Sequence, residues 1–267
     1  MEVEHFSDSS INCYLHAAKQ LCLFCGNLPD KLEEQDIFNY LNYLKNEKHL
    51  SRETVRNHLQ GIRFVYRCVY KRTDIIRDIP YPKRTKTLPV ILNSKELKLL
   101  FASAKSLKHR MILKIAYSGG LRRNEICRLK IVDIDTTNYL IRIEKSKGNK
   151  DRYSLLAKSL VPELREYYQR YKPVKYLFNG RIKGFQYSEE GLRWTFNQAL
   201  LKSGIQKDVS LHSLRHAFAS HLLAMGTSLF TIQKLLGHDD IRTTMLYLQV
   251  NHQFNQKPLI SPLDLIR

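Results

Sequence analysis

Apolar residues recur at intervals of three and four through the first third of the chain. This spacing predicts helices over residues 10–24, 32–44 and 51–70. The packed face of the third helix is expected to carry Val55, Leu59, Ile62 and Val69. The stretch "IPYPKRTKTLP", residues 79–89, then breaks the pattern, because its prolines exclude a regular helix or strand. We therefore expect a helical domain over residues 1–82, a basic linker over 83–89 and a second domain over 90–267.

The second domain combines helical spacing with one stretch of alternation. In "NYLIRIEKSKGNKDRYSLLA", residues 138–157, apolar residues alternate on each side of a Gly-Asn turn, which predicts a β-hairpin. Its apolar positions are Tyr139, Ile141 and Ile143 on one strand and Tyr153 and Leu155 on the other. Helical spacing predicts the remaining elements, over residues 93–104, 109–120, 159–170, 188–203, 214–225, 229–236 and 243–247. The expected fold is mainly α-helical with a small antiparallel β-sheet.

The chain is strongly basic, with a formal net charge of +19. Acids and bases nearly balance before the linker, so most of the surplus lies in the second domain. A surplus of this size favours a polyanionic partner, and nucleic acid is the commonest one. The third predicted helix adds four arginines that fall within about 60° of one another at ~100° per residue. We interpret this row as a DNA-contacting face, with a solvated basic face as the alternative. The row consists of Arg52, Arg56, Arg63 and Arg67.

The sequence carries no signal for a membrane span or a metal site. It contains no run of 18 apolar residues and no basic-then-apolar signal peptide, so we expect a cytoplasmic protein without membrane contact. Among the five cysteines, Cys22 and Cys25 form a CxxC pair, but the second pair that would complete a zinc site is missing. Both are expected to be structural thiols on a packed helix. No metal and no cofactor are expected.

Several polar residues of the second domain suggest phosphoryl transfer. Arg122 follows a Gly-Gly bend, His212 and Arg215 share a helix face, and Tyr247 follows His238 by nine residues. Arginine forks suit phosphate oxygens, imidazoles can move protons near neutral pH, and a tyrosine can attack phosphorus. A lysine of the hairpin turn could protonate the leaving alkoxide. Metal-dependent nucleases instead need clustered carboxylates.

Four segments resemble the signature motifs of the tyrosine recombinase (phage integrase) family, most closely its Xer-type or integron-type members. They are "YSGGLRRNEICRL", "KSKGNKDRYSLL", "HSLRHAFASHLLAMGT" and "LLGHDDIRTTMLYLQV", and the resemblance covers residues 90–250. It implies the catalytic residues Arg122, Lys147, His212, Arg215, His238 and Tyr247, supported by Glu125 and His216. Tyr247 is the implied nucleophile and Lys147 the implied general acid. Ser146 stands where many Xer-type members have glycine, so Lys145 and Lys150 are alternative acids.

The resemblance implies a site-specific recombinase that cleaves and rejoins double-stranded DNA through a 3'-phosphotyrosine intermediate. The first domain is similar to the SAM-like core-binding domain of the family. Because it begins close to Met1, we expect DNA sites with simple inverted core half-sites. The end of the chain, "SPLDLIR", predicts a short helix, which the resemblance implies docks on a neighbouring protomer in a tetramer on two sites. Such an enzyme would work at the nucleoid.

Three other functions fit parts of the pattern. A type IB topoisomerase would relax DNA by the same tyrosine attack, and a DNA-binding regulator would share the fold without catalysis. A zinc hydrolase could use His212 and His216, although no Glu partner lies within that motif.

Overall fold

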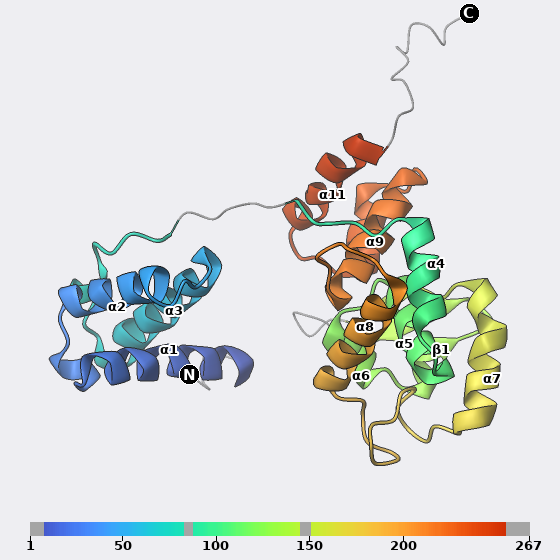
Figure 1. The fold of residues 1–267 in the computed structure, drawn as a ribbon, viewed down its shortest axis with the longest axis horizontal. Coiled ribbons are helices and arrows are strands. Elements are labelled where there is room, and N and C mark those ends of the chain that lie inside the picture. Colours follow the sequence, from blue (N-terminus) through green and yellow to red (C-terminus); the bar gives the residue numbers. More distant parts are fainter. Residues whose placement is uncertain (1–7, 83–87, 145–150, 255–267) are drawn as a thin grey trace, which may run out of the picture. The chain divides into compact units, whose positions relative to one another are not determined.

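The computed structural model describes residues 8–82, 88–144 and 151–254, and the chain divides into two compact units, Met1–Thr87 and Leu88–Arg267 (Figure 1). We call them unit 1 and unit 2. Each unit has its own cluster of buried apolar side chains.

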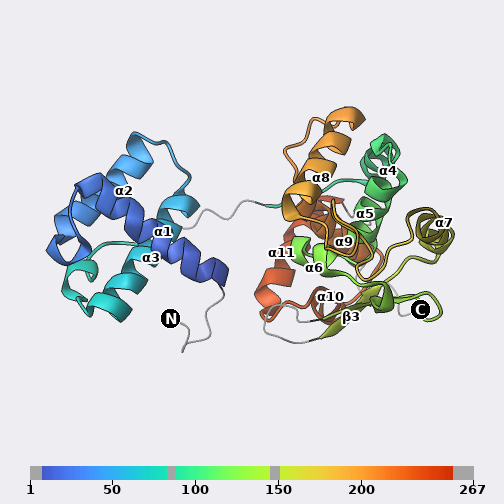
Figure 2. The ribbon, with the colours of Figure 1, turned by 90° about the horizontal axis from the view of Figure 1, so that it is seen from below.

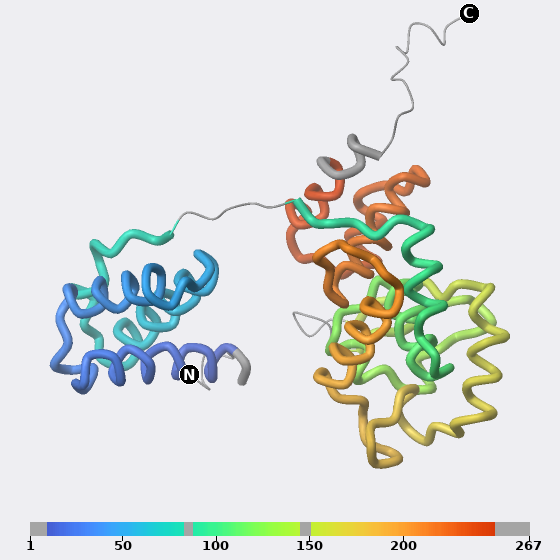
Figure 3. The backbone as a smooth tube through the Cα atoms, in the orientation of Figure 1, coloured from blue at the N-terminus to red at the C-terminus, as the bar shows by residue number. Residues whose placement is uncertain are grey.

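Unit 1 is a small helical bundle (Figure 3). Its main helices are α1 (Asp8–Cys25), α2 (Glu34–Asn46) and α3 (Arg52–Val65), with short 3-10 turns at Pro29–Lys31 and Asp74–Ile76. The Ser51 hydroxyl caps α3 by accepting a hydrogen bond from the backbone N–H of Thr54 at 3.2 Å. A Cβ atom added to Gly61 would lie 3.0 Å from the Ala17 Cβ of α1, so glycine lets α3 and α1 pack closely.

The prediction that Val69 belongs to the packed face is wrong. Val55, Leu59 and Ile62 are buried as expected, but Val69 is 58% exposed. The chain changes from α-helix to a π-helical turn at Tyr66–Tyr70. This wider turn shifts the later side chains around the helix axis, so the 3.6-residue period no longer applies to them.

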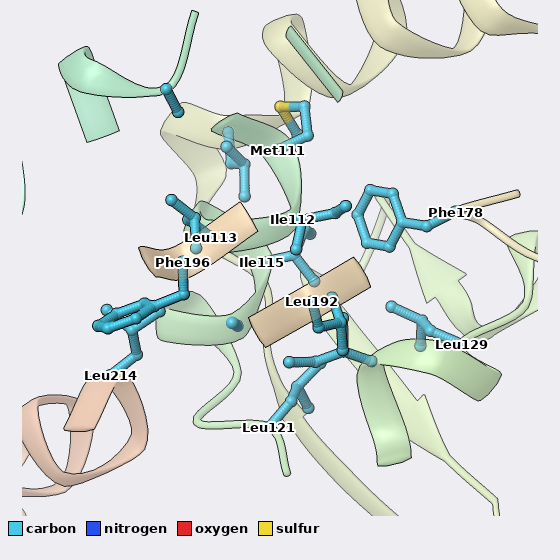
Figure 4. Close-up of a cluster of buried hydrophobic side chains, with 14 of the residues drawn as sticks. Met111, Ile112, Leu113, Ile115, Leu121, Leu129, Phe178, Leu192, Phe196 and Leu214 are labelled. Carbon is cyan, nitrogen blue, oxygen red and sulfur yellow. The ribbon is translucent and has the colours of Figure 1, made fainter. Parts of the chain in front are cut away.

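Unit 2 is mainly helical around the central helix α5. The elements that the sequence predicted are α4 (Ser94–Ser103), α5 (Leu107–Ser118), β2 (Leu140–Ile143), β3 (Arg152–Leu155), α7 (Val161–Tyr171), α8 (Glu189–Ser203), α9 (Leu211–Ala224), α10 (Leu229–Leu236) and α11 (Ile241–Phe254). The sequence analysis missed α6 (Arg123–Arg128), β1 (Ile134–Asp135) and the 3-10 turns Ile131–Asp133 and Lys158–Leu160. Figure 4 shows the core, where α5 residues such as Ile112 and Ile115 lie among Phe178, Leu192 and Phe196.

The strands form an antiparallel sheet in the order β1-β2-β3. This sheet and the surrounding helices confirm the expected fold class. On β2 the apolar alternation is also confirmed, since Ile141 and Ile143 are buried. On β3 it is wrong, because Tyr153 is 58% exposed whereas Ser154 is fully buried. The β3 residues that face inward are polar, and Arg152, paired with Ile143, is one of them.

Candidate active site

A carboxylate surrounded by three guanidinium groups forms the centre of the site. Glu125 is the third residue of α6, where its Oε2 accepts the backbone N–H of Arg122 at 2.7 Å. Its Oε1 accepts from Nη1 of the Arg122 side chain at 3.0 Å. Arg152 from β3 adds a bidentate pair, with Nη1–Oε1 at 2.6 Å and Nη2–Oε2 at 2.7 Å. Arg215 from α9 lies close by, with its Nη1 4.0 Å from Oε2.

The charges of this cluster follow from its burial. Burial alone would raise the pKa of Glu125, but Arg152 and then Arg122 outweigh it and hold that pKa at about 2. Arg215 is 1% exposed, and burial together with repulsion from Arg122 lowers its pKa to about 9. At neutral pH both groups are therefore charged, and one carboxylate faces three cations.

The C-terminal end of α10 holds the three arginines in place. The last carbonyls of a helix have no partner within the helix. Here Leu235 O accepts from Arg152 Nε at 2.9 Å, Leu236 O from Arg215 Nη2 at 2.6 Å, and Gly237 O from Arg122 Nη2 at 2.7 Å. The negative end of the helix dipole also favours cations at this position. Figure 2 shows α6, α9, α10 and α11 gathered together with β3.

Tyr247 of α11 lies in this neighbourhood and is 2% exposed. Its hydroxyl is 3.0 Å from Nδ1 of His216. Burial raises the pKa of Tyr247 to about 12, against the opposing effect of Arg215 and Arg122. Burial, with His212 and Arg215 nearby, lowers the pKa of His216 to about 4. At neutral pH the tyrosine is thus protonated and the imidazole beside it is neutral, so one tautomer of His216 can accept a hydrogen bond from the phenol.

His212 and His238 flank the cluster. His212 is exposed, and its ring meets that of His216 edge-on at 4.5 Å between centroids. Desolvation, with Arg215 and Arg122 nearby, lowers the pKa of His212. His238 follows Gly237, which ends α10 in the left-handed conformation at φ 62°. Its Nδ1 lies 2.9 Å from the Thr244 hydroxyl, and burial and the arginines lower its pKa to about 3.

The structure brings together seven of the residues that the sequence singled out, from segments far apart in the chain. They are Arg122, Glu125, His212, Arg215, His216, His238 and Tyr247. The hairpin lysines Lys145, Lys147 and Lys150 lie outside the described residues. The strands that flank their turn, β2 and β3, are described, and β3 delivers Arg152 to Glu125.

Sequence reasoning missed Arg152 and Thr244. Thr244 is fully buried, and its hydroxyl contacts His238. The signal that could have found Arg152 is its place on the predicted hairpin. Because Tyr153 and Leu155 were assigned to the core, alternation predicted that Arg152 faces outward. The reverse assignment would have placed a buried arginine opposite Ile143.

The arginines of unit 1 differ in their surroundings. Arg56 and Arg63 lie over the ring of Tyr81, at 4.7 and 4.2 Å from its centroid. Arg56 Nη1 also donates to Pro82 O at 3.1 Å, and Arg63 Nη2 donates to Ile79 O. Arg52 and Arg67 are exposed. Two of the four arginines thus hold the segment that leaves unit 1.

Two further searches were confined to the described residues. Among them, no three His, Cys, Asp or Glu side chains are grouped so that they could hold a metal ion. None of the described helices is long and apolar enough to cross a membrane.

Both units match known protein families. Residues 91–253 match the phage integrase family, and residues 1–74 match the SAM-like N-terminal domain of phage integrases. Together these matches span most of the chain.

Individual proteins are similar over most of their length. The protein y4qK of Sinorhizobium fredii, an integrase/recombinase by name, is 37% identical over 94% of this chain and 82% of its own. Tyrosine recombinase XerC of Staphylococcus haemolyticus is 29% identical over 83% of this chain and 78% of its own. The fold is similar to that of the site-specific recombinase XerH bound to a palindromic difH substrate. There the TM-score is 0.76 and the identity 24%, over 91% of this chain and 77% of that one.

Proposed function

The chain belongs to the phage integrase family and is a site-specific tyrosine recombinase, and we propose that the cluster around Arg122, Arg215 and Tyr247 is its active site. The observation that carries the proposal is the convergence of a buried tyrosine hydroxyl, a neutral histidine and a cationic cluster. These are the groups that a phosphoryl transfer to tyrosine requires.

In the proposed reaction the scissile DNA phosphate sits against Arg122 and Arg215. Their guanidinium groups stabilise the extra negative charge of the five-coordinate transition state. The Tyr247 oxygen attacks phosphorus while its phenolic proton passes to Nδ1 of the neutral His216. A P–O bond forms to tyrosine while the bond to the 5'-oxygen breaks, which leaves a 3'-phosphotyrosine.

The leaving 5'-oxygen needs a proton, and we assign this proton to Lys147 of the hairpin turn. His212 and His238 line the phosphate as neutral hydrogen-bonding groups, since both have lowered pKa values. Rejoining reverses these steps with the 5'-hydroxyl of a second strand as the nucleophile. No metal or cofactor takes part in this scheme.

The experiment that tests the proposal uses nicked suicide duplexes with a randomised centre. Wild-type protein should form adducts that survive denaturation, and Tyr247→Phe should form none. Sequencing the trapped DNA yields a duplex for later assays, which we call the selected duplex. Absence of adducts with folded wild-type protein would contradict the proposal and favour a DNA-binding regulator.

The roles of the arginines are tested best at Arg122, because its side chain is 25% exposed whereas Arg215 is 1% exposed. Arg122→Ala should bind the selected duplex with nearly unchanged affinity but form adducts at a rate lower by about a hundredfold or more. Weak binding with a normal rate in the bound state would place Arg122 in DNA binding instead.

For the partner, we propose double-stranded DNA with inverted half-sites, as in the palindromic substrate of XerH. Unit 1 would act as the core-binding domain over residues 1–82, joined by the linker 83–89 to the catalytic domain. The exposed Arg52 and Arg67 are the first candidates for phosphate contacts, and Arg56 and Arg63 would join them by leaving Tyr81. This activity would place the enzyme at the nucleoid, in the cytoplasm.

We also propose assembly into a tetramer on two sites through exchange of the C-terminal tail, which lies outside the described residues. Support comes from large apolar side chains exposed at the end of α9 and on α10 and α11, where a neighbour's tail could dock. They are Met225, Phe230 and Met245. Deletion of residues 257–267 should keep single-site binding and abolish cooperative assembly and strand exchange. A truncated protein that recombines normally would contradict the exchange.

A further inference from the structure

Arg152 is a buried arginine that the proposed reaction does not use. Its side chain is 8% exposed, as is that of Glu125. The guanidinium makes a bidentate pair with both Glu125 oxygens, at 2.6 and 2.7 Å, and Nε donates to Leu235 O at 2.9 Å. Three donors of one rigid fork are thus engaged by two different elements, α6 and α10.

Arg152 connects the hairpin to the elements that carry the other arginines of the site. It is the first residue of β3, five positions after Lys147 in the chain. Its partner Glu125 holds both the backbone and the side chain of Arg122. Its other partner, Leu235, belongs to the helix end that precedes His238. The end of the hairpin is therefore fixed against the elements that carry Arg122 and His238.

Arg152 and Arg215 both lie within reach of the Glu125 carboxylate, and Arg152 is the one that pairs with it. Arg215 Nη1 lies only 4.0 Å from Glu125 Oε2, an oxygen that Arg152 Nη2 occupies at 2.7 Å. Without Arg152, this oxygen would be available to Arg215. A carboxylate that pairs with Arg215 would neutralise a charge needed by the phosphate, because charge-assisted pairs are strong in a buried site.

We infer that Arg152 is a positioning residue of the recombination reaction, which rests on the proposed active site. It saturates the Glu125 carboxylate so that Arg122 stays oriented and Arg215 stays directed at the phosphate. It also fixes the base of the hairpin whose turn carries Lys147. It touches neither the phosphate nor the nucleophile.

A purely structural ion pair would lower stability when broken but would leave the pH dependence of cleavage unchanged. Arg152 is the largest of the favourable influences that keep the pKa of Glu125 low. Loss of Arg152 should move that pKa upward, since burial opposes the charged form. The groups facing Glu125 are Arg122, Arg152 and Arg215. Glu125 also lines a cavity with further charged groups, Arg128, Lys130, Asp133, Arg142 and Glu144.

The test compares adduct formation on the selected duplex by Arg152→Gln, Glu125→Gln and the double variant. Arg152→Gln should bind DNA normally and cleave about tenfold to a hundredfold more slowly, by analogy with the loss seen when hydrogen-bond partners that orient metal ligands are removed. Its rate should also begin to fall at a higher pH than the wild-type rate on acidification. The double variant should cleave at the rate of Glu125→Gln alone, and its rate should no longer show the shifted fall on acidification, because the carboxyl that titrates is gone.

Controls separate this role from folding and from the proposed function. Arg110→Gln removes another ion-paired arginine of unit 2, beside Glu163, and should cleave at the wild-type rate. If Arg152→Gln does not fold, the double variant, which removes the carboxylate and its bidentate partner together, supplies the comparison with Glu125→Gln. The inference would be overturned if the rate losses of the two single variants multiplied in the double variant. It would also be overturned if folded Arg152→Gln lost cleavage on acidification at the same pH as the wild type. Failure of wild-type protein to form adducts would instead overturn the proposed function.

Discussion

Inorganic phosphate should stabilise unit 2 in the absence of DNA, because the described part of the site contains three guanidinium groups and one carboxylate close to them. Glu125 can neutralise only one of these charges. Burial and repulsion from Arg122 lower the pKa of Arg215 to about 9, because both disfavour its protonated form. A bound oxyanion reverses part of this cost by pairing with Arg122 and Arg215. The site is thus organised in advance for an anion.

The expected size follows from binding linkage. Phosphate at ten times its dissociation constant stabilises the folded state by about 1.4 kcal/mol. For a domain of this size, that corresponds to a rise in melting temperature of about 3–6 °C. The single tryptophan, Trp194 in α8, makes intrinsic fluorescence a reporter of unit 2 alone. Melting should be compared in phosphate and in chloride at equal ionic strength.

A control is needed because phosphate also stabilises proteins by being excluded from their surface. This general effect should persist in Arg122→Ala, whereas the saturable part should be lost. Equal stabilisation of wild-type and Arg122→Ala protein would refute the reasoning. So would a phosphate effect that rises without saturation in the wild type.

Three further predictions concern the hairpin, the arginines of unit 1 and the histidines. Lys147→Ala should regain cleavage on a duplex with a 5'-phosphorothiolate leaving group, because a thiolate needs no proton; rescue of Lys145→Ala instead would move the general acid. Tyr81→Ala should release the two arginines stacked on its ring and steepen the salt dependence of DNA binding by up to about two units; an unchanged slope would leave them without a phosphate role. His216 and His238 have pKa values lowered to about 4 and about 3, so below pH ~6.5 the unfolded chain takes up protons that the folded chain does not. Urea unfolding should therefore show stability falling by about 1.4 kcal/mol per pH unit for each histidine as pH drops from 6.5 toward 4. A stability that stays constant over this range would contradict their burial as neutral rings.

The fold class and most helices could be predicted from the sequence, because amphipathic spacing indicates which side of a helix is buried. The limits of α10 were predicted to the residue, where Ser228 caps the start and Gly237 ends the helix. Predictions from the 3.6-residue period were wrong where the helix geometry changes, as in the π-helical turn in which Val69 is exposed. The period also gave no sign of α6, which has six residues, too few for a periodic pattern.

The candidate site was predictable to the extent that its residues lie in recognisable motifs. Arg122, Arg215 and Tyr247 stood out because unusual polar groups interrupt apolar stretches. Arg152 did not, because alternation that assigns Tyr153 and Leu155 to the core places Arg152 on the outward-facing side. In the structure the exposed neighbour is Tyr153, and the charge is buried because its partner, Glu125, comes from another element. No local pattern contains that information, since a buried charge depends on a tertiary partner.

Two glycines complete the explanation of how the site is held. Gly120 and Gly237 both adopt positive φ, at 57° and 62°, and the carbonyl of each accepts an arginine, Arg215 and Arg122 respectively. A Cβ on Gly120 would lie 2.3 Å from the Phe218 ring, so a side chain there would force α9 away. Because α9 also carries Arg215, this shift would move the arginine that Gly120 O holds. Backbone carbonyls therefore fix the geometry of the arginine cluster, at positions where glycine lets the chain turn sharply. The arginine side chains are oriented by their hydrogen bonds to these carbonyls.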